Sequence, residues 1–151
     1  RPWLDPERVG SWGWSGGGSM SLNAIFKFPD LYQTAIAVAS VPDQRHYDTI
    51  YQERYMGLPT ENRKAFHDGS PINFAQNLEG NLLLIHGAAD DNCHYQTYLK
   101  LVDKLIEHNK PFSMMTYPRG THSINEGKNA RRHVYETMTR FLHEKMPPGP
   151  R

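Results

Sequence analysis

Short apolar runs alternate with longer stretches of helical periodicity along the chain. Thr34 to Ser40 is a continuous apolar run, as expected of a strand that is buried on both faces of a parallel sheet. The predicted strands are the run that ends at Gly13 and residues 34–40, 82–85 and 112–117. The predicted helices cover residues 19–28, 44–56, the segment between 92 and 109, and 128–145. Short helices and loops are expected from residue 57 to residue 80. This alternation predicts an α/β fold: a parallel sheet of about four strands with helices on both faces and right-handed crossovers.

The same periodicity predicts which side chains face the sheet. They are Met20, Leu22, Ala24, Ile25 and Phe28 on the first helix and Val134, Met138, Phe141 and Leu142 on the last one, while Tyr47, Tyr51 and Tyr55 share one helical face. No repeat or low-complexity linker interrupts the pattern, so residues 1–151 are predicted to belong to one domain. Residues 1–6 are expected to end a preceding helix and loop, and the tail from Met146 is expected to be frayed.

The junction between the first strand and the first helix carries the most specific motif. Gly13, Ser15 and Gly17 have the Gly-x-Ser-x-Gly spacing of a nucleophile elbow, a sharp turn that holds a serine in strained backbone. The N–H of Gly16 would then lie at a helix N-terminus, where it can bind an oxyanion. A glycine-rich phosphate-binding loop is the alternative, but the P-loop lysine is missing and the Gly-x-Gly-x-x-Gly register does not fit.

Composition narrows the range of partners. The 17 basic and 16 acidic residues give a net charge of +1, which gives no reason to expect a nucleic acid or a membrane surface as a partner. The single cysteine, Cys93, excludes an internal disulfide, and no apolar run reaches the roughly 18 residues of a membrane span. Several strands precede the elbow in an α/β-hydrolase, so an elbow that begins at residue 9 suggests the C-terminal part of a longer polypeptide.

A serine nucleophile needs a base to take its proton and an acid to orient that base. In an α/β-hydrolase the acid and then the histidine follow the serine, each on a loop after a strand. Of the eight histidines, only His122 lies on a loop directly after a predicted strand. The loop after residues 82–85 offers Asp90 and Asp91, which spacing does not separate, and Asp43 is a less favoured third candidate.

Three segments carry motifs with further meaning. They are Gly13-Trp14-Ser15-Gly16-Gly17, Tyr47-Asp48-x-x-Tyr51-x-Glu53-Arg54-Tyr55-Met56-Gly57-Leu58-Pro59 and His86-Gly87-x-Ala89-Asp90-Asp91-Asn92. Together they resemble the prolyl oligopeptidase family of serine peptidases, and within it the dipeptidyl peptidase IV branch, over almost the whole chain. The resemblance implies the C-terminal part of an α/β-hydrolase catalytic domain. It also implies that Asp90 is the acid, with His122 falling 32 residues later as the family's pattern requires.

The resemblance implies further site residues. Tyr47 and Tyr51 match tyrosines that line the pocket for the side chain just before the scissile bond, and Val41 matches another wall of that pocket. Asn92 matches a residue that hydrogen-bonds a substrate carbonyl, and Cys93 stands where valine is common. Without the resemblance, the tyrosines would be interpreted as ordinary helix packing and Asn92 as a helix N-cap.

Two positions depart from the pattern of this branch. Gly16 replaces a usual tyrosine, and Gln44 stands where a pocket tryptophan is common. A pocket without these two aromatic walls is expected to be wider, which weakens the expectation of a strict preference for proline.

The resemblance also implies partners. We expect a peptide substrate and no nucleic acid, metal or cofactor. The upstream half of the same polypeptide is expected to supply a second oxyanion donor, a tyrosine, and a β-propeller whose glutamates bind the amino terminus of the substrate. A homodimer through the C-terminal helix is a further expectation. The residues do not define a compartment, and the resemblance suggests a secreted, periplasmic or membrane-anchored protein.

Three hypotheses for function follow. The first is a serine peptidase that removes N-terminal dipeptides after a penultimate proline or small residue, through a Ser15-Asp90-His122 triad and an acyl-enzyme. The second is an acylaminoacyl-peptidase, oligopeptidase or esterase with the same chemistry, which Gly16 and Gln44 favour. The third is a non-catalytic peptidase-like domain or a catalytically weak fragment. The intact triad residues argue against degeneration, whereas the missing upstream half predicts low activity for the chain alone.

Overall fold

The computed structural model describes residues 5–147 and residue 149. Four strands form one sheet in the order β1 (Gly10–Trp14), β2 (Thr34–Val38), β3 (Asn81–Gly87) and β4 (Ser113–Tyr117), and every neighbouring pair is parallel. This topology confirms the predicted parallel sheet. Val38 is in register with Trp14 on one side and with Ile85 on the other, so the strands reach the same sheet edge with their carboxyl ends.

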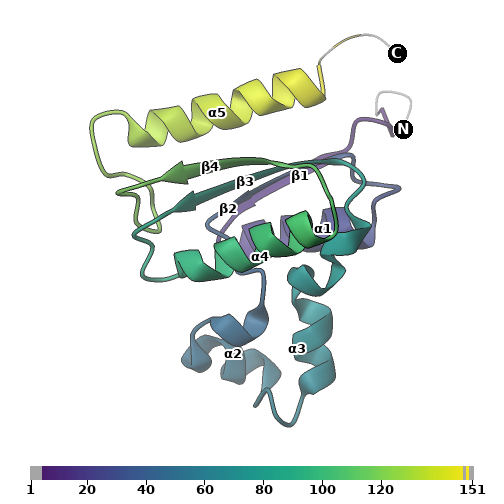
Figure 1. Cartoon of the computed structure of the whole chain (residues 1–151), viewed down its shortest axis with the longest axis vertical. Coiled ribbons are helices and arrows are strands. Elements are labelled where there is room, and N and C mark those ends of the chain that lie inside the picture. The colour runs from purple at the N-terminus through teal and green to yellow at the C-terminus, as the bar shows by residue number, and fades with distance from the viewer. Residues whose placement is uncertain (1–4, 148, 150–151) are drawn as a thin grey trace.

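Helices cover both faces of the sheet. Helices α1 (Gly16–Lys27) and α4 (Tyr95–Glu107), with the 3₁₀ helix η2 (Pro71–Asn77), pack on one face, and α5 (Ala130–Lys145) lies across the other (Figure 1). Every residue of β2 is buried, as a continuous apolar run between two covered faces requires. None of the helices in the described part of the chain is long and apolar enough to cross a membrane.

Each covered face has its own hydrophobic core. The core under α1 and α4 is built from alternate residues of the central strands, among them Ala35, Ala37, Leu82 and Leu84, together with Leu22, Ile25, Phe26, Leu101 and Leu105 of the helices. The core under α5 uses the opposite faces of the same strands, including Ile36, Val38, Leu83 and Ile85, with Val134, Met138 and Phe141 of α5, and Leu142 packs against it partly buried. The inward face predicted for α5 is therefore confirmed.

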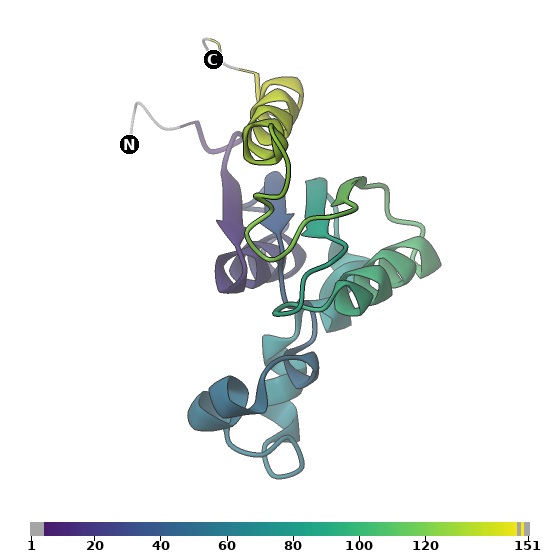
Figure 2. The same ribbon diagram turned by 90° about the vertical axis from the view of Figure 1, so that its left-hand side faces the viewer.

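The connection from β2 to β3 forms a helical projection. It contains η1 (Gln44–His46), α2 (Thr49–Met56) and α3 (Arg63–Gly69), and Figure 2 shows α2 and α3 extending away from the sheet, beyond its helical layers. Tyr47, Tyr51 and Tyr55 form a continuous edge-to-face series, with ring centroids 5.5 Å and 5.0 Å apart. Tyr47 precedes α2, so the prediction that the three tyrosines share one helical face holds for Tyr51 and Tyr55 and is wrong for Tyr47.

Some sequence predictions were wrong in detail. Helix α1 begins at Gly16 instead of Ser19, because the serine of the elbow leads directly into the first helical turn. Met20 and Phe28 are 68% and 58% exposed instead of facing the sheet. Helix α5 begins at Ala130 instead of Lys128. The expectations for residues 1–4 and for Pro148, Pro150 and Arg151 lie outside the described residues.

Candidate active site

Ser15 occupies a strained turn between β1 and α1. Its φ of 58° and ψ of −123° lie where side chains with a Cβ are rarely found. Backbone packing requires glycine at position 13, because a Cβ on Gly13 would come within 2.1 Å of the Gly17 carbonyl carbon. The Ser15 N–H donates to the Val38 carbonyl at 2.8 Å, which ties the turn to β2. The sequence Gly-x-Ser-x-Gly thus folds as the elbow that it predicts.

Gly16 is the first residue of α1 and is exposed. Its N–H belongs to the first helical turn, whose amides have no acceptor within the helix. A Cβ on Gly16 would meet no atom within 4 Å, so the space around this residue is open. The positive end of the helix dipole and the Gly16 N–H therefore directly follow Ser15 in the chain, a position suited to an oxyanion donor.

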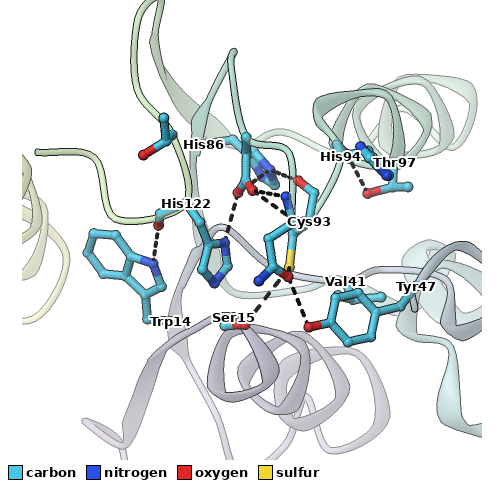
Figure 3. Close-up of polar contacts among 12 residues, drawn as sticks. Trp14, Ser15, Val41, Tyr47, His86, Cys93, His94, Thr97 and His122 are labelled. Carbon is cyan, nitrogen blue, oxygen red and sulfur yellow. Dashed lines mark hydrogen bonds and ion pairs between the residues drawn. The ribbon is translucent and has the colours of Figure 1, made fainter. Parts of the chain in front are cut away.

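The loops after β3 and β4 bring Asp90 and His122 together. Nδ1 of His122 lies 2.9 Å from Oδ2 of Asp90, whose side chain is completely buried. The main-chain carbonyl of His122 accepts a hydrogen bond of 2.8 Å from Nε1–H of Trp14, the residue before the nucleophile. Figure 3 shows the His122 ring directed toward Ser15. A serine, an imidazole and a carboxylate thus converge at one edge of the sheet.

Asp90 accepts several hydrogen bonds. The N–H groups of Asn92 and Cys93 donate to Oδ1 at 3.0 and 2.9 Å, and Nε2 of His86 lies 3.4 Å from Oδ2. Burial by itself would raise the pKa of Asp90. The hydrogen bonds from His86 and His122 and from the two amides outweigh burial and lower the pKa to about 2. The carboxylate is therefore ionised at neutral pH and favours a proton on Nδ1 of His122, which leaves Nε2 as the basic nitrogen.

The other two candidate acids lie elsewhere. Asp91 is exposed and, together with Asn92, lines a hollow of about 640 Å³. Asp43 pairs with Arg45 at 2.7 Å, and although burial works to raise its pKa, the hydrogen bonds from Arg45 keep it below the ordinary value. The geometry thus brings Asp90, and neither of the alternatives, to His122.

The Ser15 hydroxyl lies against Cys93, with Oγ and Sγ 3.9 Å apart. Within the described residues, no hydrogen bond joins Ser15 to His122. Cys93 is 1% exposed, and burial, with only a weaker opposing effect from Ser15, raises the pKa of its thiol to about 11. A thiol reacts as its thiolate, so the raised pKa disfavours the reactive form of Cys93 at neutral pH, and Ser15 is the candidate nucleophile of this site.

A hollow of about 730 Å³ opens beside Ser15. Val41, Tyr47 and Tyr51 all line it, and their role in binding the substrate side chain stays a prediction. Asn92 does not line this hollow, but its Oδ1 accepts a hydrogen bond of 2.9 Å from the Tyr47 hydroxyl at the boundary with the 640 Å³ hollow. The buried Cys93 contacts Ser15 but is not part of either lining.

Sequence reasoning missed two residues that hold this site together. His86 is completely buried at the end of β3, and its Nε2 is 2.7 Å from the Cys93 carbonyl as well as close to Asp90. Trp14 anchors the His122 loop, as described above. Only their positions in the sequence could have indicated these roles. Trp14 adjoins the candidate nucleophile, and His86 lies at the end of the strand before the loop that carries Asp90. No group of three or more histidine, cysteine or acidic side chains in the described part of the chain could hold a metal ion.

A parallel sheet with a serine at a strand-to-helix elbow, followed by an aspartate and a histidine on later strand ends, defines an α/β-hydrolase domain. The model of the prolyl oligopeptidase family matches residues 1–148, and the chain belongs to this family. It is 42% identical to a probable dipeptidyl-aminopeptidase B of Aspergillus niger over 146 residues, which are 94% of this chain and 16% of that protein. It is 37% identical to the prolyl endopeptidase FAP of Mus musculus, over 93% of this chain and 19% of that protein.

The crystal structure of Porphyromonas gingivalis dipeptidyl peptidase 4 superimposes on this chain with a TM-score of 0.93 and is 39% identical in sequence. The superposition covers 96% of this chain and 20% of the dipeptidyl peptidase 4 chain. The chain therefore corresponds to a portion of the catalytic domain of the dipeptidyl peptidase IV branch and spans about a fifth or less of the length of these relatives.

Proposed function

We propose that the polypeptide containing this chain is a serine peptidase that removes dipeptides from the amino terminus of peptides. The observation that carries the proposal is the 2.9 Å contact between His122 and the buried, ionised Asp90, beside a serine held in an elbow. The names of the relatives, among them a dipeptidyl-aminopeptidase and a dipeptidyl peptidase 4, support the choice of substrate.

The residues suggest how the reaction proceeds. Oγ of Ser15 attacks the carbonyl carbon of the scissile bond while Nε2 of His122 takes the hydroxyl proton. The carbonyl oxygen becomes an oxyanion, which the Gly16 N–H stabilises. The carbon–nitrogen bond then breaks, and the proton on His122 passes to the leaving amine. Water, activated by the same imidazole, hydrolyses the ester on Ser15 and releases the dipeptide.

The geometry of the site is compatible with this sequence of steps. The Ser15 hydroxyl rests against Cys93, and a rotation about one side-chain bond changes its direction without moving the backbone of the elbow. Contacts between nucleophile and base are often long before substrate binds. Asp90 is already engaged, so the imidazole has its orientation and tautomer before the reaction begins.

Fluorophosphonate labelling tests the proposal. The reagent is expected to form a stoichiometric adduct that mass spectrometry maps to Ser15. The adduct should be absent from Ser15→Ala and present in Cys93→Ala, because the neighbouring thiol is neutral. If a folded chain is not labelled, the same assay is applied to the longest natural polypeptide that contains it. Absence of an adduct there refutes the peptidase proposal.

A second experiment separates dipeptide removal from the related activities. Hydrolysis of a Gly-Pro reporter with a free amino terminus, and not of its N-acetylated form, is the expected result. Preferential hydrolysis of the acetylated reporter would instead identify an acylaminoacyl-peptidase. The open space at Gly16 is the structural feature that favours this second activity.

A further inference from the structure

The loop between β4 and α5, which carries His122, contains a strained turn. The Ile124 N–H donates to the Thr121 carbonyl at 3.2 Å, which closes a tight turn with His122 inside it. Ile124 has a φ of 47°, a value that β-branched residues rarely adopt, and its side chain is completely buried in the core under α5. Strained backbone persists only where surrounding contacts hold it, so the contacts of this turn determine where the imidazole lies.

Thr121, the residue directly before His122, is held by Glu126. The Thr121 N–H donates to Oε2 of Glu126 at 3.0 Å, and the Thr121 hydroxyl donates to Oε1. One carboxylate therefore accepts from both donors of the same residue, one with each oxygen, and ties residue 121 to residue 126 across the turn. Hydrogen bonds to an ionised group are roughly twice as strong as neutral ones, so this contact is well suited to hold the turn.

Glu126 does not itself belong to the triad or to the hollows beside it. The hydrogen bonds from Thr121 lower the pKa of the Glu126 carboxyl below its ordinary value, so the group is ionised at neutral pH and can only accept. Glu126 lines neither the 730 Å³ hollow beside Ser15 nor the 640 Å³ hollow at Asn92. In the described part of the chain, it makes no hydrogen bond to any of the three triad residues. Its effect on the site must therefore pass through Thr121.

From this arrangement, and on the basis of the proposed peptidase function, we infer that Glu126 is a positioning residue for His122. Its carboxylate holds the backbone from which the imidazole projects, so that the ring stays directed toward Ser15 (Figure 3). The contact from Trp14 acts on the carbonyl of His122, whereas the contact from Glu126 acts on the residue before it. The two contacts therefore hold the turn on both sides of the imidazole.

Substitution of Glu126 in the longest natural polypeptide that contains the chain tests this inference. Fluorophosphonate labelling reports the number of intact sites as its amplitude and the reactivity of each site as its rate constant. Glu126→Ala should leave the amplitude unchanged and lower the rate constant about ten- to 100-fold, since a misplacement of about 1 Å has an effect of this order. Glu126→Gln should stay within about threefold of the natural rate, because its oxygen accepts from the Thr121 N–H and its NH₂ group donates to the hydroxyl.

Turnover of a Gly-Pro reporter separates positioning from substrate binding. Because Glu126 lines neither hollow, Glu126→Ala should lower kcat per labelled site in parallel with the labelling rate and leave KM within about twofold. Thr121→Val removes one of the two donors and should lower kcat about threefold or more, whereas Thr121→Ser keeps both donors and should have the natural kcat. Glu136→Ala is the matched control, because this exposed glutamate of α5 accepts from Arg132 at 2.6 Å, outside the His122 loop, and its loss should leave kcat unchanged.

Three results would overturn the inference. Glu126→Ala could be labelled at the natural rate, or it could lose amplitude without losing rate, which would show that Glu126 only helps the protein to fold. Equal losses in Glu126→Ala and Glu126→Gln would show that the charge, and not the contact with Thr121, is responsible.

The design also separates the failure of this inference from the failure of the peptidase proposal. If Glu126→Ala does not fold, the comparison of Thr121→Val with Thr121→Ser decides, and equal rates for these two variants refute the positioning role. A natural polypeptide that is labelled, with variants that react at its rate, refutes only the role of Glu126. A natural polypeptide that is not labelled refutes the peptidase function and the positioning role with it.

Discussion

Replacement of Asp90 by asparagine measures how strongly the fold depends on an ionised carboxylate at the site. Hydrogen bonds lower the pKa of this group from 3.8 to about 2 in spite of its burial. At about 1.36 kcal/mol for each pKa unit, this lowering corresponds to a stabilisation on the order of 2 kcal/mol. Because the pKa in the folded state is the lower one, this stabilisation is complete above the unfolded value of 3.8 and is lost as the pH falls through about 2.

The asparagine side chain reproduces only half of the arrangement. Its oxygen can still accept from the amides of Asn92 and Cys93, but its NH₂ group faces His86 and His122, whose nitrogens act as donors to the carboxylate. Urea unfolding at pH 7, followed by circular dichroism, should therefore show a loss of about 2 kcal/mol in the free energy of unfolding. The difference from the natural sequence should shrink as the pH is lowered from 4 to 2.

Asp91→Asn is the matched control, since this neighbour is exposed, and it should change the free energy of unfolding by no more than about 0.5 kcal/mol. Asp90→Asn should also slow fluorophosphonate labelling by up to about 10⁴-fold, the effect of the same change on turnover in a serine–histidine–aspartate triad. A stability difference that is the same at every pH, or a normal labelling rate, would refute the role given to the carboxylate.

Three further substitutions test the surroundings of the triad. His86→Leu removes a buried donor to Asp90, so it should lower the free energy of unfolding by about 1–3 kcal/mol and move the acidic limb of the labelling rate to higher pH. His86→Gln keeps an N–H donor and should recover most of the rate. Similar pH profiles for both variants would contradict this role of His86. Trp14→Phe removes the N–H that holds the His122 carbonyl, so it should lower the free energy of unfolding in urea by about 1 kcal/mol and slow labelling several-fold. An unchanged labelling rate would show that other contacts hold the loop. Gly13→Ala places a Cβ on the backbone of α1 and should lower stability by about 3 kcal/mol or more, and a variant as stable as the natural sequence would contradict the elbow geometry.

The sheet and the order of the site residues could be predicted because both depend on local patterns. Four short apolar runs separated by helical periodicity specify parallel strands, and the carboxyl ends of parallel strands share one edge. The positions of Ser15, Asp90 and His122 after successive strands then bring them together without any knowledge of tertiary contacts. Spacing could not choose between Asp90 and Asp91, because the direction of a loop side chain depends on which amides its carboxylate caps.

The errors in α1 have a physical cause of the same kind. Periodicity identifies an apolar stripe, but only neighbouring elements decide which part of the stripe is buried. Helix α1 packs beside β1, the end strand of the sheet, and Met20 and Phe28 line the hollow beside Ser15 instead of the core. The roles of His86 and Trp14 could not be predicted either, since both act through hydrogen bonds to backbone carbonyls, and the one from Trp14 reaches across 108 residues.

The candidate site is positioned by the sheet itself, because the hydrogen-bond ladder continues beyond the strand ends into the functional loops. The Ser15 N–H donates to Val38 of β2 at 2.8 Å, the Ala39 N–H donates to Ile85 of β3 at 2.9 Å, and the Ala88 N–H donates to the last carbonyl of β4 at 2.9 Å. Each loop is thus held in register with its neighbour for at least one residue past its strand. The sheet therefore fixes the bases of the loops that carry the candidate nucleophile, acid and histidine. The pocket wall, by contrast, belongs to the helical projection between β2 and β3, where sequence changes can alter specificity without moving these residues.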